Sequence, residues 1–454
     1  MARCATGAWW NCASTSTRGP RSPCSRPSPE HRRGVLTGRI LRSGWSWLLL
    51  QQSRNIEVRA TFFALVSVAA AVLAPFLEPP VPEALAMRLG TETVRGILEV
   101  LASSMLVVAT FSLGTLISAY AVASSSTTPR VTELLMQDTR VQNAIGIFVG
   151  AFLFALAGLI ALGAGLYREH GGVLLFLVTI AVVVVVVAVF LRWVDLVSRV
   201  GRIPDAVDRT VRAARKALDD RLKRPWLGAA PYGALEVRSR IGAPRGAYLR
   251  HVDLAKLQEL ATGAGGRFRL EVLPGDFVGV DETLLVADVE LGADAARQAR
   301  DAFDLGPRRT FDLDPRYGVI TLAEIGCKAL SPGINDPGTA INVIAALTGV
   351  LGDVTAADVE PEAPAFDRIQ ARTIADADLI EDAFGALARA GAGHAQVLVR
   401  LQKSLALLAS GRHMPLADAA RTMSATVTEL AEAGLTLAAD RERIRALMPP
   451  GADR

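Results

Sequence analysis

The chain has 454 residues, of which 51% are hydrophobic and 21% charged, and its formal net charge at pH 7 is +4. This length allows two or three domains. A small net charge spread along the chain excludes the concentrated basic surface of a nucleic-acid-binding protein, so we predict no nucleic-acid partner. The four cysteines form no C-x-x-C pair and no Cys/His cluster, which argues against a disulfide framework or a zinc site. We predict neither a metal nor another cofactor.

Residues 1–42 are rich in arginine, serine, proline and tryptophan and show no periodic apolar pattern. They lack the apolar core of about 7–15 residues that a signal peptide requires. We predict a disordered N-terminal tail and expect translation to begin further downstream.

Four long apolar runs follow, at residues 60–77, 96–123, 144–166 and 173–194. A helix of roughly 20 apolar residues crosses the hydrocarbon core of a bilayer, which is about 30 Å thick. Such a helix also satisfies its own backbone donors and acceptors, which lipid cannot do. We therefore predict a domain of four transmembrane helices over residues 43–198, with the lipid bilayer as its partner.

The basic residues predict an orientation. Residues 192–224, which begin within the fourth run, hold ten basic and five acidic residues. Cytoplasmic segments of membrane proteins carry an excess of lysine and arginine. The heavy use of alanine, glycine, valine and arginine, with few lysines, indicates a GC-rich bacterial genome. We therefore expect a multi-pass protein of the bacterial plasma (inner) membrane with both termini in the cytoplasm.

Three segments after the membrane domain differ in periodicity. Residues 199–225 predict a basic amphipathic linker helix, which either lies on anionic headgroups or packs as a soluble core helix. Residues 226–310 alternate or run apolar between turn residues and predict a small β-rich module with one helix. Residues 311–450 return to helical spacing. The predicted fold class is a membrane α-helical domain of four transmembrane helices followed by a cytoplasmic α+β domain with a helical C-terminal part.

The second apolar run carries a polar face. At about 100° per residue, its members fall within one arc of the helix. An ionisable residue on an intramembrane polar face is a functional-site hypothesis by default. In one interpretation the face lines a path for ions or a small polar solute; in the other, its acidic residue is solvated at the interface and its hydroxyls are ordinary helix-packing groups. The face consists of Glu99, Ser103, Thr110, Gly114 and Ser118.

The third apolar run carries a face of small residues that begins with Gly146 and Gly150. Small residues allow close approach of helices where lipid offers no hydrophobic drive for association. This face packs either on other helices of the same chain, which we favour, or on a neighbouring subunit.

The loop between the second and third runs holds a group of polar residues. Thr128 is placed to cap a short helix that has Pro129 at its first position. Arg130, Asp138 and Gln142 form a polar cluster at the cytoplasmic mouth in one interpretation. In the other, which we favour, they hold the loop against the soluble domain.

An unusual turn separates two predicted helices of the soluble half. The first helix is predicted over Val319–Leu330, and Gly333 permits a positive φ. Asn335 or Asp336 then caps a second helix with Pro337 at its first position. The free N–H groups of the second helix offer an anion site, although a stiff interhelical elbow is the favoured interpretation. The residues of this elbow are Ser331, Pro332, Gly333, Asn335, Asp336 and Pro337.

The loop and the elbow together carry a resemblance to a known family. The loop reads T-P-R at residues 128–130, followed by Asp138 and Gln142, and the elbow reads A-L-S-P-G-I-N-D-P at residues 329–337. In these residues, and in their order from about residue 40 to 450, the chain resembles the bacterial predicted membrane proteins that share domain of unknown function 2254. The resemblance implies a four-span inner-membrane protein with a cytoplasmic domain, and it implies no reaction, substrate or catalytic residue.

Two positions depart from the family pattern. Thr128 stands where the family usually has serine, and Arg192-Trp193 stand where a histidine pair is expected after the fourth span. The absence of the histidine pair at residues 192–193 argues against any proton or metal role that the resemblance would assign to those histidines.

The functional hypotheses belong to three classes. The P-loop, H-E-x-x-H, G-x-S-x-G and Rossmann glycine patterns are absent, so we predict no enzyme and no catalytic residue. The favoured hypothesis is a homo-oligomeric channel-like or transporter-like protein with a regulatory cytoplasmic domain. The alternative is a membrane-anchored sensor, or a module that binds an unidentified ligand or partner, whose spans are only a tether. The third is a membrane hydrolase with a metal held by Asp312, Asp314 and Asp336.

Overall fold

The computed structural model describes residues 56–73, 91–136, 138–167, 169–199, 201–356 and 360–452. The predicted disordered tail, residues 1–42, lies outside these ranges.

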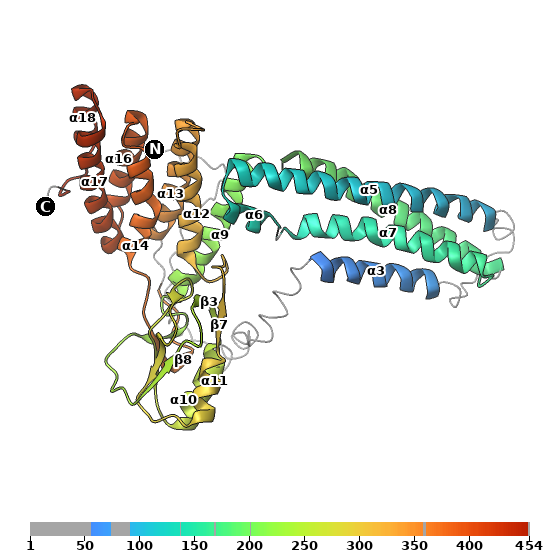
Figure 1. The fold of residues 1–454 in the computed structure, drawn as a ribbon, viewed down its shortest axis with the longest axis horizontal. Coiled ribbons are helices and arrows are strands. Elements are labelled where there is room, and N and C mark those ends of the chain that lie inside the picture. The colour runs from blue at the N-terminus through green and yellow to red at the C-terminus, as the bar shows by residue number, and fades with distance from the viewer. Residues whose placement is uncertain are drawn as a thin grey trace, which may run out of the picture. The chain divides into compact units, whose positions relative to one another are not determined.

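Four long helices of the N-terminal half form the apolar bundle (Figure 1). Helix α7 packs against each of the other three. A Cβ added at Gly150 of α7 would lie 2.8 Å from the Ser67 hydroxyl oxygen of α3, and one added at Gly158 would lie 3.1 Å from Leu98 Cδ1 of α5. The small residues of α7 therefore serve contacts within the chain, as we favoured. The bundle consists of α3 (Ile56–Leu73), α5 (Thr91–Ser126), α7 (Thr139–Gly163) and α8 (Glu169–Arg199).

The structure refines the predicted spans. Among the described residues, four helices are long and apolar enough to cross a membrane by length and composition, and three of them match predicted runs: Glu92–Ser126, Thr139–Gly163 and Val173–Arg199. The predicted first span corresponds to α3, whose apolar part, Thr61–Ala71, is shorter; residues 74–77 of that prediction lie outside the described ranges. The fourth candidate, Pro337–Val354, was not predicted as a span.

Helix α5 is longer than its predicted run of residues 96–123. Its 36 residues correspond to about 54 Å of helix, well beyond the roughly 30 Å core of a bilayer. The helix is therefore longer than the stretch that a bilayer core would cover.

The helical region, which contains α9 and the helices from α12 onward, encloses one large hydrophobic core. Helix α13 packs there against α9, α12 and α16, and its Val343, Ile344 and Leu347 are fully buried. Contacts with these three helices thus bury the large apolar side chains of α13 within the protein. The region consists of α9 (Ile203–Lys223), α12 (Pro315–Ala329), α13 (Pro337–Ala356), α14 (Asp376–Ile380), the π-helix η2 (Glu381–Gly385), α15 (Ala386–Ala390), α16 (Ala395–Ala409), α17 (Met414–Gly434) and α18 (Ala438–Arg445).

The predicted linker helix is a core helix of this region. Helix α9 packs against α12 and α13. The approach to α12 is close, since a Cβ added at Gly318 would lie 2.7 Å from the Cβ of Ala214. This contact favours the soluble-core interpretation of residues 199–225 over a helix lying on headgroups.

The β module contains two sheets, of order β1-β8-β4-β6-β2 and β5-β3-β7. Strand β8 runs parallel to both of its neighbours, although it lies outside the predicted module of residues 226–310. The chain leaves the module through α12 and α13 and returns to complete the sheet. The module has two helices instead of the one predicted: α10 (Leu254–Ala264) and α11 (Ala293–Arg300). Its strands are β1 (Ala229–Pro231), β2 (Ser239–Gly242), β3 (Ala247–Val252), β4 (Phe268–Leu270), β5 (Phe277–Val278), β6 (Thr283–Ala287), β7 (Phe303–Gly306) and β8 (Phe366–Ala371).

Candidate functional site

The predicted polar face of α5 points away from the bundle of its own chain. The Ser103 hydroxyl donates to the Glu99 carbonyl at 2.9 Å, and the Thr110 hydroxyl donates to the Leu106 carbonyl at 2.8 Å. The Glu99 carboxylate pairs with Arg95 one turn earlier at 3.4 Å. The face thus has local partners for these polar groups. All five of its residues are exposed: Glu99, Ser103, Thr110, Gly114 and Ser118.

The interior of the apolar bundle is almost free of polar side chains. In the described parts of its four helices, the buried polar side chains are Ser112, Gln142 and Thr179. A groove of about 550 Å³ between α5 and α8 is lined mainly by apolar residues; Glu92, Thr93 and Ser104 are its polar lining residues, and the predicted polar face lies outside it. The described residues therefore form no polar path through the interior of the bundle. If a path ran along the polar face of α5, a second copy of the chain would have to enclose it on the other side.

The loop after α5 binds the helical region through Arg130. Helix α6 (Pro129–Met136) begins at Pro129, as predicted, and Arg130 pairs with Glu324 of α12. The Arg130 guanidinium also lies over the ring of Tyr317, 5.5 Å from its centroid. Burial raises the pKa of the Glu324 carboxyl above its usual value, even with Arg130 beside it.

Thr128 occupies the residue before this helix, but its hydroxyl does not cap it. The backbone N–H groups of Val131 and Thr132 bond to the Thr128 carbonyl. The Thr128 hydroxyl itself is buried, and among the described residues it has no hydrogen-bond partner. The predicted side-chain cap is therefore wrong, while the predicted helix start is confirmed.

A second link joins the start of α7 to α9. The Asp138 carboxylate caps α7 by accepting from the Arg140 N–H at 2.8 Å, and it also pairs with Arg209 of α9. Arg209 binds Asp205 at 2.7 Å as well. Asp138 and Arg209 are 10% and 16% exposed, so this is the more buried of the two links. The Gln142 side-chain amide donates to the Met136 carbonyl at 2.9 Å.

The end of α5 enters the same contact region. Ala123 belongs to the hydrophobic core of the helical region, together with Val131 and Leu135 of α6. The Lys328 ammonium of α12 donates to the Ser124 carbonyl at 3.1 Å. We call these contacts of α5, α6 and the start of α7 with α9 and α12 the junction. These contacts hold the loop against the helical region, which is the interpretation that we favoured for Arg130 and Asp138.

The first turn of α12 connects the junction to the β module. Asp314 caps α12 by accepting from the Tyr317 N–H at 3.1 Å, and it pairs with Arg309 at 2.6 Å. Asp314 is 2% exposed, and burial raises the pKa of its carboxyl. A Cβ added at Gly275 of the β module would collide with this carboxylate. The turn around Gly275 therefore rests directly on the capping residue of α12.

The elbow after α12 is a capped turn. Asp336 accepts from the N–H and the hydroxyl of Thr339, at 3.0 and 2.6 Å, so it caps α13, which begins at Pro337. Asn335 has a positive φ of +50°. The sequence had suggested Gly333 for this conformation, and Gly333 does not adopt it. The Ser331 hydroxyl donates to the Lys328 carbonyl at 2.6 Å. Pro332 and Gly333 are exposed.

These contacts bear on the anion and metal hypotheses. The Asp336 carboxylate already occupies the first turn of α13, where an anion was expected to bind. Asp314 and Asp336 cap different helices, and the described residues contain no group of three or more His, Cys, Asp or Glu side chains that could hold a metal ion. The structure therefore does not bring Asp312, Asp314 and Asp336 together as a metal site.

The sequence interpretation did not identify the junction residues Arg209 and Glu324, nor Arg309, which pairs with the α12 cap Asp314. Glu324 carries a detectable signal, since it is the acidic residue within the apolar stretch Val319–Leu330. Arg209 is one of ten basic residues in its segment, so its sequence context does not distinguish it.

The chain is similar to several known proteins and to one family of proteins. No solved structure matches the chain. Uncharacterised proteins of Mycobacterium bovis and of two strains of Mycobacterium tuberculosis are 25% identical over 281 residues, which cover 56% of this chain. The match covers 51% of each relative, so the chain spans about half the length of the curated relatives it matches. The model of a family described as predicted membrane proteins matches residues 53–407. The chain therefore belongs to this family, which shares domain of unknown function 2254.

Proposed function

We propose that this protein is a homo-oligomeric channel-like or transporter-like membrane protein whose C-terminal half regulates its spans. The observation that carries the proposal is the junction. Helix α5 bears the polar face, and the same continuous helix ends in the hydrophobic core of the helical region. A change in the packing of α9 or α12 would therefore act on α5 directly.

The charges of the junction support mechanical coupling. Arg130 of the loop pairs with Glu324 of α12, and Asp138 at the start of α7 pairs with Arg209 of α9. A tether that only anchors a soluble domain needs no shared core and no buried ion pair. These contacts favour a regulated membrane unit over the alternative, a sensor with passive spans.

The oligomer follows from the position of the polar face. Glu99, Thr110 and Ser118 are exposed on a single chain, and the bundle interior is apolar. A hydrated path along α5 would therefore be lined by α5 helices from several copies. In this proposal the protein lies in the bacterial plasma membrane with both termini in the cytoplasm.

The test is flux through the full-length protein in liposomes, measured for potassium, chloride and glycerol. We expect at least one flux above that of empty vesicles, and a several-fold reduction in Glu99→Ala and Thr110→Val. The matched control is Thr179→Val, because Thr179 is fully buried on α8 and its hydroxyl donates to the Leu175 carbonyl at 2.7 Å. This control should retain the flux.

The regulatory part is tested by Asp138→Asn, which weakens the link between α7 and α9. We expect the flux to change while the oligomeric state in detergent is retained. Flux equal to that of empty vesicles for all three solutes, or a monomer in detergent, would contradict the proposal. The topology would be contradicted if a C-terminal tag could be reached from outside intact cells.

A further inference from the structure

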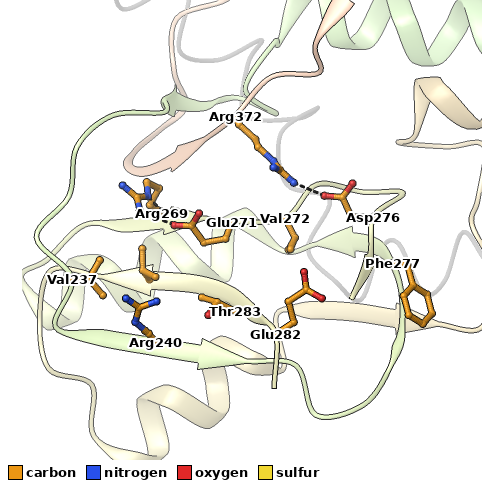
Figure 2. A pocket seen from close by; sticks show the side chains of 11 residues that line it. Val237, Arg240, Arg269, Glu271, Val272, Asp276, Phe277, Glu282, Thr283 and Arg372 are labelled. Carbon is orange, nitrogen blue, oxygen red and sulfur yellow. Dashed lines mark hydrogen bonds and ion pairs between the residues drawn. The ribbon is translucent and has the colours of Figure 1, made fainter. Parts of the chain in front are cut away.

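The β module contains a polar cavity that the proposed membrane function does not use (Figure 2). Its volume is about 550 Å³. Small-molecule sites in proteins typically occupy about 300–1,000 Å³. The cavity is therefore large enough for a ligand of mononucleotide size. Its charged lining residues are Arg240, Arg269, Glu271, Asp276, Glu282 and Arg372.

Two arginines flank an apolar floor. Arg240 of β2 and Arg269 of β4 both lie opposite Val286 of the intervening strand β6. Residues directly opposite in antiparallel strands share a face, so the two guanidinium groups rise from the same side of the sheet, from Cα atoms about 10 Å apart. Figure 2 shows Arg269 and Arg240 at the same end of the cavity.

The three cavity arginines differ in their partners. Arg269 pairs with Glu271 at 2.8 Å, and Arg372 pairs with Asp276 at 2.7 Å, as drawn in Figure 2. Arg240 is exposed, and its side chain has no hydrogen bond or ion pair with the described residues. One guanidinium in the cavity is therefore available to an anionic group.

A carboxylate with spare acceptor capacity lines the same cavity. Glu282 uses one oxygen to accept from the Gly279 N–H at 2.7 Å. An ionised carboxylate offers about four acceptor positions on its two oxygens. Glu282 can therefore accept from hydroxyl groups of a ligand whose anionic end binds Arg240.

We infer that this cavity binds a hydroxyl-bearing organic phosphate of mononucleotide size. The planar fork of Arg240 matches two phosphate oxygens, and Arg269 lies close enough to contribute charge. Glu282 accepts from the hydroxyl groups, in the way that acidic residues bind ribose. Val237, Val272 and Val286 supply apolar contact for the rest of the ligand. In the regulatory role proposed above, this phosphate would be the regulating ligand. Binding itself does not depend on that role; only the effect on the junction, described next, rests on the proposed function.

The consequence follows from the turn beside the cavity. Asp276 follows Gly275, which has a φ of +102° and lies against the Asp314 carboxylate that caps α12. A ligand bound between Arg240 and Glu282 would fill the cavity beside Asp276, and so would shift this turn. The disturbance would then reach the first turn of α12, which belongs to the junction.

Binding is tested with full-length protein in detergent, by calorimetric titration and by the thermal unfolding midpoint. The probes are AMP, ribose 5-phosphate, adenosine and inorganic phosphate. We expect AMP and ribose 5-phosphate to bind saturably and raise the midpoint, while adenosine, which lacks the phosphate, does not bind. Arg240→Gln should weaken AMP binding by about 10- to 100-fold, as loss of charge-assisted hydrogen bonds predicts.

The matched control is Arg297→Gln in the same module. Arg297 is exposed on α11 and pairs only locally, with Asp294, so this variant should bind AMP as the unchanged protein does. If Arg240→Gln lowered the midpoint of the free protein, Arg240→Lys would replace it as the cavity variant; lysine keeps the charge but lacks the planar fork, so a smaller loss of AMP affinity is expected.

Four results would overturn the inference. They are no binding of AMP or ribose 5-phosphate, binding of adenosine as tight as that of AMP, wild-type affinity in the cavity variant, and displacement of AMP by an equal concentration of inorganic phosphate. Displacement by phosphatidylglycerol at the AMP concentration would assign the site to lipid headgroups instead of a soluble ligand. Because none of these measurements uses flux, their failure is distinguishable from failure of the channel-like function.

Discussion

Helices α8 and α13 are both long and apolar enough to cross a membrane, but they differ in what surrounds them. In α8 only 22% of the apolar window is buried, and Val184 and Leu191 are 63% and 66% exposed. In α13 the share is 44%, and its large side chains pack into the core of the helical region. Composition thus identifies candidate spans, and exposed apolar surface such as that of α8 is the surface that lipid would cover.

The largest expected effect compares phenylalanine in the two regions. Phe384 is fully buried in the helical region, so Phe384→Ala should lower the free energy of unfolding by about 3–5 kcal/mol. Phe111 is 74% exposed on α5, and Phe111→Ala should change this free energy by less than about 0.5 kcal/mol. Chemical denaturation of the detergent-solubilised protein measures both. Equal losses would mean that Phe111 is packed in the native assembly as deeply as Phe384.

The next effect compares two ion pairs, one at the junction and one at the end of α8. Asp138→Ala removes the cap of α7 and one partner of Arg209, which is 16% exposed, so it should lower the free energy of unfolding by about 1–3 kcal/mol. Asp195 pairs with Arg199 on α8, and both side chains are more than 60% exposed. Asp195→Ala should therefore cost less than about 1 kcal/mol.

Comparing Asp138→Ala with Asp195→Ala tests whether the junction links the apolar bundle to the helical region. Limited proteolysis provides a second readout, since Asp138→Ala should expose the segment between α6 and α7 to cleavage while Asp195→Ala should not. Equal stability of the two variants would contradict the junction as a structural link.

The junction also shows how far the sequence could predict the structure. The apolar runs predicted three long helices of the bundle, and Pro129 and Pro337 marked two helix starts, because these signals are local. The pairing of Arg130 with Glu324 joins residues 194 positions apart, and no local pattern encodes it. Strand β8 was missed for the same reason, since its neighbours β1 and β4 are distant in sequence. The polar face of α5 was predictable from helical periodicity, but its outward direction depends on which face α7 covers.

A smaller effect concerns pH at the junction. Burial raises the pKa of Glu324 above its ordinary value of 4.5, so the folded protein holds this proton more tightly than the unfolded chain. Stability contributed by this group is therefore lost as pH rises from 4.5 through the raised pKa. Relative to Glu324→Gln, which does not titrate, the wild-type thermal midpoint should fall across that window. A difference between the two proteins that stays constant with pH would contradict the raised pKa.

The smallest effect has the opposite sign and lies at the exposed elbow. Hydrogen bonds from Thr339 lower the pKa of Asp336 below its ordinary value of 3.8. The folded protein therefore binds this proton more weakly than the unfolded chain, and the stabilisation is present above pH 3.8 and is lost as pH falls through the lowered pKa. Asp336→Asn keeps an acceptor for the cap of α13 but removes the titration, so the wild-type midpoint should fall relative to this variant only in acid. Because Asp336 is well solvated and Glu324 is half-buried, the elbow should respond less than the junction. A larger response at Asp336 would show that the elbow is covered in the native assembly, which would make it part of an interface.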